Sequence, residues 1–278
     1  MSTMMKTKNK KENKMIKENY MQFYEDNGYL VIENAIPEDN IDSYLSLMED
    51  NLTEDKNGKK RAWSGHSSYL AVDESLDILC HENVQNALEA LGKGVALHLE
   101  LPYWVSTEKK WHQDNVLSNP IAGNNYVGVW VALEDVDADA GPFEVIPGSH
   151  KWEIDSDKVY ADQYEGSGTK PHYEFLQEEI DKREVTDTFI FLPKKGDAVI
   201  WHGKLIHRGA PPVDSSLTRK SLIGHYCNML ANNESTEEAS GIDDIISRMY
   251  LDREDSEYAR WKNGGYYFVN PGKTKSDN

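Results

Sequence analysis

The chain contains little cysteine and no long apolar segment. Only Cys80 and Cys227 occur among 278 residues, which excludes a secreted scaffold held by several disulfides and favours a reducing, cytoplasmic location. No apolar run reaches the roughly 18 residues that a membrane-spanning helix needs, so a transmembrane protein is not expected. The first 20 residues carry six lysines and no apolar core, so they do not match a secretory signal.

Basic residues are scarce relative to acidic ones. Thirty Lys and Arg stand against 48 Asp and Glu, which gives a formal net charge of −18. Such a surface repels phosphate groups, so neither nucleic acid nor an anionic membrane is expected as a partner. The region 134–190 alone holds 16 acidic and 5 basic side chains. This acidic insert is either a lid that steers cationic or zwitterionic substrates, or a solvated surface without a specific function.

The arrangement of segments predicts one mainly β domain with helical decoration. Residues 1–14 are rich in Lys and Asn without periodicity, which predicts a disordered basic tail before a single domain over 15–278. Many short strands after a pair of N-terminal helices are typical of a jelly roll or barrel. Helices are expected at 15–26, 37–52, 174–183 and 242–260, and strands at 29–32, 95–105, 126–133, 142–146, 188–192, 198–207 and 220–230.

The most specific local pattern is Trp111-His112-Gln113-Asp114. Residues two apart in an extended chain point to one face, so His112 and Asp114 can hold one metal ion. Alone the pattern is weak, because a surface histidine beside an aspartate is common. A third ligand must come from elsewhere. His202 and His207 lie five apart on a predicted strand and face opposite sides, so only one of them should bind the metal.

A set of two histidines and one carboxylate leaves three coordination positions open. That arrangement suits Fe(II) that must also bind a co-substrate and dioxygen. Further along the chain, Arg219 and Ser221 share a face of another predicted strand. A guanidinium with a hydroxyl forms a good receptor for a carboxylate. An arginine on an inward strand face also needs an anionic partner.

Together these residues resemble the phytanoyl-CoA dioxygenase family of Fe(II)- and 2-oxoglutarate-dependent oxygenases. The resemblance covers roughly residues 16–230. It rests on the WHQD motif, His202, His207 and Arg219, and on the segments at Tyr24, 27–31, 129–133, 141–150, 196–197 and 205–206.

The resemblance implies a double-stranded β-helix, a cupin-like jelly roll, with its core at about 95–230. It implies that His112, Asp114 and His207 bind Fe(II), and that Arg219 holds the distal carboxylate of 2-oxoglutarate, with Ser221 as a second contact. Trp130 matches a position that lines the co-substrate pocket.

The implied reaction is hydroxylation of an unactivated C–H bond in a small molecule, with release of succinate and CO₂. The same oxidant can instead serve desaturation, cyclisation or epimerisation. A non-catalytic jelly roll that binds a metal or a small ligand is the alternative from another class.

Two comparisons with the family pattern sharpen the expectation. Many members carry a Lys-Pro pair ahead of the WHQD motif, whereas this stretch reads Tyr103-Trp104-Val105-Ser106. What contacts the metal-bound carboxylate of 2-oxoglutarate is therefore open. Halogenating relatives replace the carboxylate ligand with a small residue, so the presence of Asp114 argues against a halogenase.

Substrate contacts are harder to predict. His98 and Glu100 share a strand face that points either into the barrel or to solvent. His150 follows a Pro-Gly-Ser turn and either touches substrate or orders that turn. A structural hydrogen bond is favoured for His202, and a core position for Trp104 and Trp111. Asn115 and Tyr126 are further candidates for the pocket.

Overall fold

The computed structural model describes residues 19–54, 58–63, 68–92, 95–114, 126–154, 172–228, 259–262 and 265–268. The helices are α2 (Glu38–Met48), α3 (Ser75–Leu79), α4 (Glu82–Ala90) and α6 (His172–Lys182), with 3₁₀ turns η1 (Glu49–Asn51), η2 (Ser68–Leu70), η5 (Ala138–Ala140) and η6 (Ser149–Lys151). Residues 19–27 are also helical. No helix in these ranges is long and apolar enough to cross a membrane.

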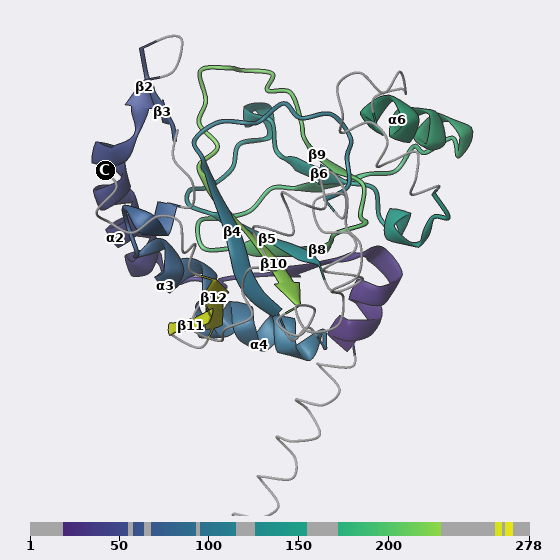
Figure 1. Ribbon diagram of the computed structural model, residues 1–278. Helices are drawn as coiled ribbons and strands as arrows, with labels where there is room; N and C mark the ends of the chain where they lie inside the picture. Colours follow the sequence, from purple (N-terminus) through teal and green to yellow (C-terminus); the bar gives the residue numbers. More distant parts are fainter. Residues whose placement is uncertain are drawn as a thin grey trace, which may run out of the picture.

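A seven-stranded sheet is the largest element of the fold (Figure 1). Its order is β1 (Tyr29–Ile32), β8 (Ala198–His202), β5 (Val127–Ala132), β10 (Ser221–Asn228), β4 (Val95–Tyr103), β12 (Gly265–Phe268) and β11 (Ala259–Lys262). Strand β10 pairs antiparallel with both β4 and β5, which places these three strands at the centre.

A three-stranded sheet faces the large one. It consists of β7 (Phe189–Phe191), β6 (Phe143–Val145) and β9 (His207–Gly209). Trp130 and Trp201 from the large sheet pack with Phe143 and Phe191 from the small one in one buried cluster. Two antiparallel sheets around a shared core confirm the predicted mainly β jelly-roll architecture. A separate hairpin joins β2 (Thr53–Glu54) and β3 (Lys60–Ala62).

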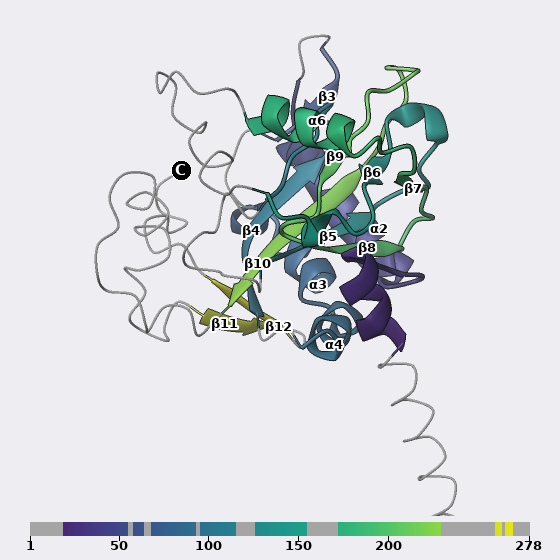
Figure 2. The ribbon, with the colours of Figure 1, turned by 90° about the vertical axis from the view of Figure 1, so that its right-hand side faces the viewer.

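Helices α2, α3 and α4 cover the other face of the large sheet (Figure 2). Val127, Val129 and Val131 of β5 pack into this helical layer, while the alternate residue Trp130 packs toward the small sheet. Strand β5 is therefore buried on both faces. This explains why its sequence is an unbroken apolar run rather than an alternation of apolar and polar residues.

Most predicted elements are confirmed, including the helix that ends at Asn27-Gly28. Gly28 has a φ of 81°, and its N–H donates to Tyr24 O at 2.7 Å, which closes the helix in the left-handed conformation that favours glycine. The predicted tail 1–14 lies outside the described residues. Helices α3 and α4 were not predicted from the sequence.

Three boundaries were wrong. The single strand expected at 198–207 is divided into β8 and β9, because the chain turns at Gly203, whose N–H donates to Tyr126 O at 2.9 Å. The sheet extends beyond the expected core of 95–230, because β1 and β12 both join it. Of the helix expected at 242–260, residues 242–258 lie outside the described part, and Arg260 belongs to strand β11.

Candidate metal centre

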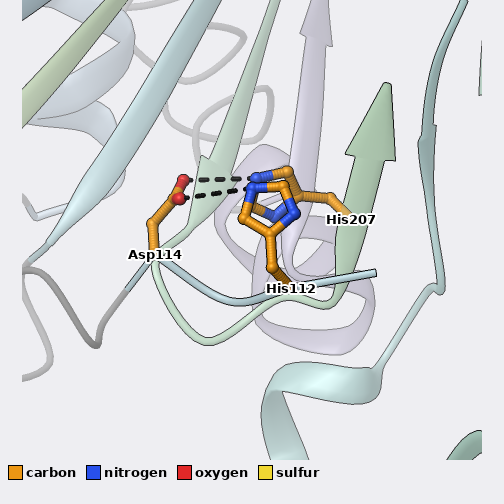
Figure 3. A group of neighbouring side chains, drawn as sticks. All are labelled: His112, Asp114 and His207. Atoms are coloured by element: carbon orange, nitrogen blue, oxygen red, sulfur yellow. Dashed lines mark ion pairs between the residues drawn. The ribbon is translucent and has the colours of Figure 1, made fainter. Parts of the chain in front are cut away.

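His112, Asp114 and His207 meet between the two sheets (Figure 3). Their potential ligand atoms all lie within 4.8 Å of one another, and all three residues are buried. Backbone pairing fixes this arrangement. His112 and His207 exchange two N–H···O bonds of 3.0 Å, and Asp114 N–H donates to Gly203 O at 2.8 Å. The turn that breaks the predicted strand at Gly203 therefore also anchors the aspartate.

Both histidines present the same ring nitrogen to the centre. His112 Nδ1 lies 2.8 Å from Lys110 O, and His207 Nδ1 lies 2.9 Å from Leu205 O. A carbonyl can only accept, so each Nδ1 carries the proton and each Nε2 is left as the ligand atom. The two Nε2 atoms face Asp114 at 3.6 Å and 3.3 Å.

His112 and Asp114 are in the protonation states that a metal requires. Burial is the main cause that holds the pKa of His112 well below its usual value, so its imidazole is neutral. Burial would raise the pKa of Asp114, but its histidine neighbours hold that pKa well below the usual range. The site therefore offers a neutral imidazole at His112 and an anionic carboxylate at Asp114, which are the metal-binding forms.

Trp201 and His225 also lie beside the Asp114 carboxylate, and neither was predicted from the sequence. Trp201 Nε1 donates to Asp114 Oδ2 at 3.0 Å, and His225 Nδ1 lies 3.9 Å from the same oxygen. Strict alternation along β10 from Arg219 would have reached His225, because residues two apart share a face. The role of Trp201 depends on the approach of β8 to the metal loop, which no local pattern reveals.

A second group of polar side chains lies beside the metal cluster. Arg219 and Trp130 line the same pocket as the three ligand candidates. Arg219 is 2 % exposed, its Nη1 donates to Gly141 O at 2.9 Å, and its guanidinium carbon lies 5.8 Å from the Trp130 ring centre. Ser221, also predicted for this role, is fully buried two residues further along but is not among the residues that line the pocket.

Three buried polar atoms of this group have no hydrogen-bond partner among the described residues. They are Arg219 Nε, Trp130 Nε1 and Ser221 Oγ. Burial lowers the pKa of Arg219 to about 10, so the guanidinium is still charged at neutral pH. A buried cation without a counter-ion is costly, and an entering carboxylate would remove that cost. The residues present therefore fit the distal carboxylate of a 2-oxo dicarboxylic acid.

Glu100 neither lines the pocket nor faces solvent, so both alternatives expected for it are wrong. Leu101 and Tyr103 of β4 line the pocket, whereas Glu100 is fully buried on the opposite face. It accepts hydrogen bonds from Ser68 Oγ and Tyr69 N–H at 2.5 Å. Strand alternation could not tell which face of β4 points toward the pocket. The side chain of His98 is not among those described.

The other substrate candidates are also separated from the pocket. His150 Nε2 contacts Glu25 O at 3.1 Å, and its ring lies 5.3 Å from that of His202, so it orders the turn against the N-terminal helix. His150 is not among the described residues that line the pocket of the metal cluster. Tyr126 is buried and stacks on His225 at 5.7 Å, behind the pocket wall. Asn115 lies outside the described residues.

His202 and the two tryptophans assigned to the core behave as expected. His202 Nδ1 accepts from Lys204 N–H at 3.0 Å, which is a local structural bond. Trp104 belongs to the main core cluster. Trp111 is buried in a smaller cluster under the guanidinium of Arg208, at 4.2 Å.

Comparison with known proteins assigns the family. The family model of the phytanoyl-CoA dioxygenases (PhyH) matches residues 24–221, most of the chain. The chain belongs to the phytanoyl-CoA dioxygenase family. It is 25% identical over 272 residues to the peroxisomal phytanoyl-CoA dioxygenase of Bos taurus, covering 86% of this chain and 79% of that one.

A shorter match reaches higher identity. The phytanoyl-CoA dioxygenase domain-containing protein 1 of Danio rerio is 37% identical over 102 residues, or 36% of this chain. That match spans about a third of the relative, 32% of its length.

Solved structures share the fold of this family member. The non-haem α-ketoglutarate-dependent epimerase SnoN aligns with a TM-score of 0.58 at 16% identity, covering 81% of this chain and 92% of SnoN. Iron-bound EctD from S. alaskensis also aligns with a TM-score of 0.58 at 16% identity, covering 79% of this chain and 80% of EctD. The carbocyclase SnoK aligns with a TM-score of 0.56 at 14% identity, covering 76% of this chain and 83% of SnoK.

Proposed function

We propose that this family member is an Fe(II)- and 2-oxoglutarate-dependent dioxygenase that hydroxylates an unactivated C–H bond of a small molecule, with release of succinate and CO₂. One observation carries the proposal. A single pocket holds a His-Asp-His cluster in metal-binding form, and beside it a buried guanidinium with an unsatisfied Nε. The membership in a dioxygenase family gives the arrangement its chemical context.

The donor set fits iron. Two imidazole nitrogens and one carboxylate oxygen, from His112, His207 and Asp114, would hold the ion. This donor set is typical of Fe(II) that also binds a co-substrate and dioxygen. Iron bound there would supply the oxygen and electron-transfer chemistry of the reaction, which protein side chains cannot provide.

The chain's own residues bind, orient and exclude water. Arg219 would pair with the distal carboxylate of 2-oxoglutarate, and Trp130 Nε1 and Ser221 Oγ would each supply a further hydrogen bond. Trp201 keeps Asp114 in one orientation. Phe143 and Ile223 add apolar wall to the pocket, which limits water around the reacting centre.

Epimerisation, cyclisation and desaturation are alternative reactions for the same metal and co-substrate site. The structures that share this fold include an epimerase and a carbocyclase from nogalamycin biosynthesis. Each of these three reactions would differ from hydroxylation in the pose of the substrate.

A thermal-shift experiment separates the enzyme from a simple metal-binding jelly roll. We expect 2-oxoglutarate to raise the melting temperature only when Mn²⁺ or anaerobic Fe(II) is present, because chelation requires both. The joint effect should vanish in His207→Ala and remain in His202→Ala, a matched histidine outside the cluster. Equal stabilisation by 2-oxoglutarate with and without metal would contradict the proposal.

A further inference from the structure

Lys109 lines the pocket that holds the metal cluster, and nothing in the proposed function uses it. It lies three residues before His112 on the loop that follows β4. Lys109 is exposed, whereas Arg219 of the same pocket is buried. The pocket therefore has one cation in its interior and another toward solvent.

Among the described residues, the ammonium of Lys109 has no partner. It makes no hydrogen bond and no ion pair in that part of the chain, while the ammonium of its neighbour Lys110 lies 4.2 Å above the Tyr173 ring. Lys109 lines the same pocket as His112, Asp114 and His207, so its charge is available to a ligand that enters that pocket.

The charge balance of the pocket points to an anionic ligand. Among the described residues that line it, Asp114 is the sole carboxylate, against the two cations Lys109 and Arg219. Asp114 is committed to the cluster, and Arg219 to the distal carboxylate of the co-substrate. One cation is left over at the exposed side, in a chain whose net charge is −18. The remaining wall is largely apolar, with Leu101, Phe143 and Ile223.

We propose that Lys109 binds a carboxylate of the primary substrate at the entrance of the pocket, and so selects small carboxylic acids with an apolar body. The inference rests on the proposed function and names its substrate class. Zwitterionic amino acids satisfy it, whereas amines without a carboxylate do not. Of the cationic or zwitterionic substrates that the acidic insert suggested, the proposal keeps only those that carry a carboxylate. Asp155, Asp157 and Asp162 of that insert lie outside the described residues.

The first experiment tests whether Lys109 binds 2-oxoglutarate rather than the primary substrate. Anaerobic titration of the Fe(II) protein with 2-oxoglutarate, followed by its visible band, should give one affinity for the wild type, Lys109→Ala and Lys110→Ala. A large loss of affinity in Lys109→Ala alone would assign Lys109 to the co-substrate and overturn the proposal. Failure of the wild type to form the band would contradict the proposed function itself, and the inference with it.

The second experiment measures substrate selection. Matched series of carboxylic acids, primary amides and amines, with equal carbon skeletons and with amino acids included, would be tested for succinate release above background. Perturbation of the anaerobic band would be recorded in parallel. We expect responses from acids only, with KM raised about tenfold or more in Lys109→Ala and Lys109→Glu, as loss of one charge-assisted bond predicts. Lys109→Arg and Lys110→Ala should keep the wild-type KM.

Three results would overturn the proposal while the proposed function stands. The first is that amides or amines support succinate release at the same level as acids do. The second is that the acids show the same KM in Lys109→Glu as in the wild type, and the third is that no acid in the series perturbs a band that otherwise forms normally.

Discussion

At the residue scale, the metal cluster depends on few atoms, and each can be removed separately. His112 and His207 are oriented by carbonyls two residues before them in the chain, and Asp114 is held by Trp201. His112 and Asp114 could be predicted from the sequence because the H-x-D spacing is local. Strand parity indicated only that one of His202 and His207 should bind the metal, and the choice of His207 came from the family resemblance.

Substitution of a ligand candidate should abolish activity rather than weaken it. We expect His207→Ala and Asp114→Ala to lose stoichiometric Fe(II) and to reduce 2-oxoglutarate turnover by at least about a hundredfold. The reason is that the site offers only three protein ligands, and all three are needed to retain the metal ion. Metal analysis and succinate release would measure both effects. His202→Ala is the control, and wild-type turnover in either ligand variant would refute the assignment.

The indole N–H of Trp130 permits a conservative test of the carboxylate receptor. Trp130→Phe replaces the indole with a smaller aromatic ring and removes the unsatisfied Nε1–H. We expect the Kd for 2-oxoglutarate to rise about fivefold, the effect of one hydrogen bond of about 1 kcal/mol, and to rise further in Arg219→Ala. Trp104→Phe, in the main core, should leave the Kd unchanged. Equal Kd values in the wild type and Trp130→Phe would remove Trp130 from the receptor.

At the scale of elements, strand β5 packs so closely against the Trp201 side chain that position 128 has no space for a Cβ atom. A Cβ on Gly128 would lie 2.0 Å from Trp201 Cζ2. The sequence shows a glycine in an apolar strand but not the indole that needs the space, because the two strands pair across about 70 residues of chain. Strand β5 therefore helps to position Asp114 through Trp201.

Gly128→Ala should therefore damage both the fold and the metal centre. Overpacking of this kind costs about 1–3 kcal/mol in unfolding free energy, and displacement of Trp201 should also weaken Fe(II) binding. Val129→Ala is the matched control, since Val129 packs toward the helices. It should lose comparable stability with unchanged metal affinity. Unchanged metal affinity in both variants would contradict the positioning role of Trp201.

The elements that sequence reasoning missed are short or distant. Helix α3 has five residues, too few to establish a helical period. Strand β12 meets β4 through one parallel pair, Tyr267 with Leu97, and such long-range pairing leaves no local signal. Glu100 was misplaced for a related reason, because alternation gives two faces and only the packed helices decide which is inner.

At the scale of the whole molecule, Glu100 ties the helical layer to the large sheet. Ser75 Oγ of α3 adds a hydrogen bond of 3.2 Å to those from η2, and Tyr44 of α2 bonds to Ser68 at 3.1 Å. Burial raises the pKa of Glu100 from 4.5 to about 7, although these bonds lower it. The folded protein therefore holds this proton more tightly than the unfolded chain does.

Stability should fall as pH rises through this range. A raised carboxyl pKa contributes stability that is fully present below about pH 4.5 and is lost as pH rises through about 7. We expect urea unfolding of the wild type to lose on the order of 3 kcal/mol more than Glu100→Gln between pH 5 and pH 8. Parallel pH profiles for the two proteins would show that Glu100 does not titrate in this way.

The central claim is that one pocket assembles Fe(II) and 2-oxoglutarate together. The most direct measurement is the anaerobic visible spectrum of the metal-free protein, given Fe(II) first and 2-oxoglutarate second. The account predicts a weak charge-transfer band that appears only with both additions, is absent in His207→Ala and needs more 2-oxoglutarate in Arg219→Ala. A wild-type protein that forms no band, and shows no metal-dependent thermal shift, would contradict the account.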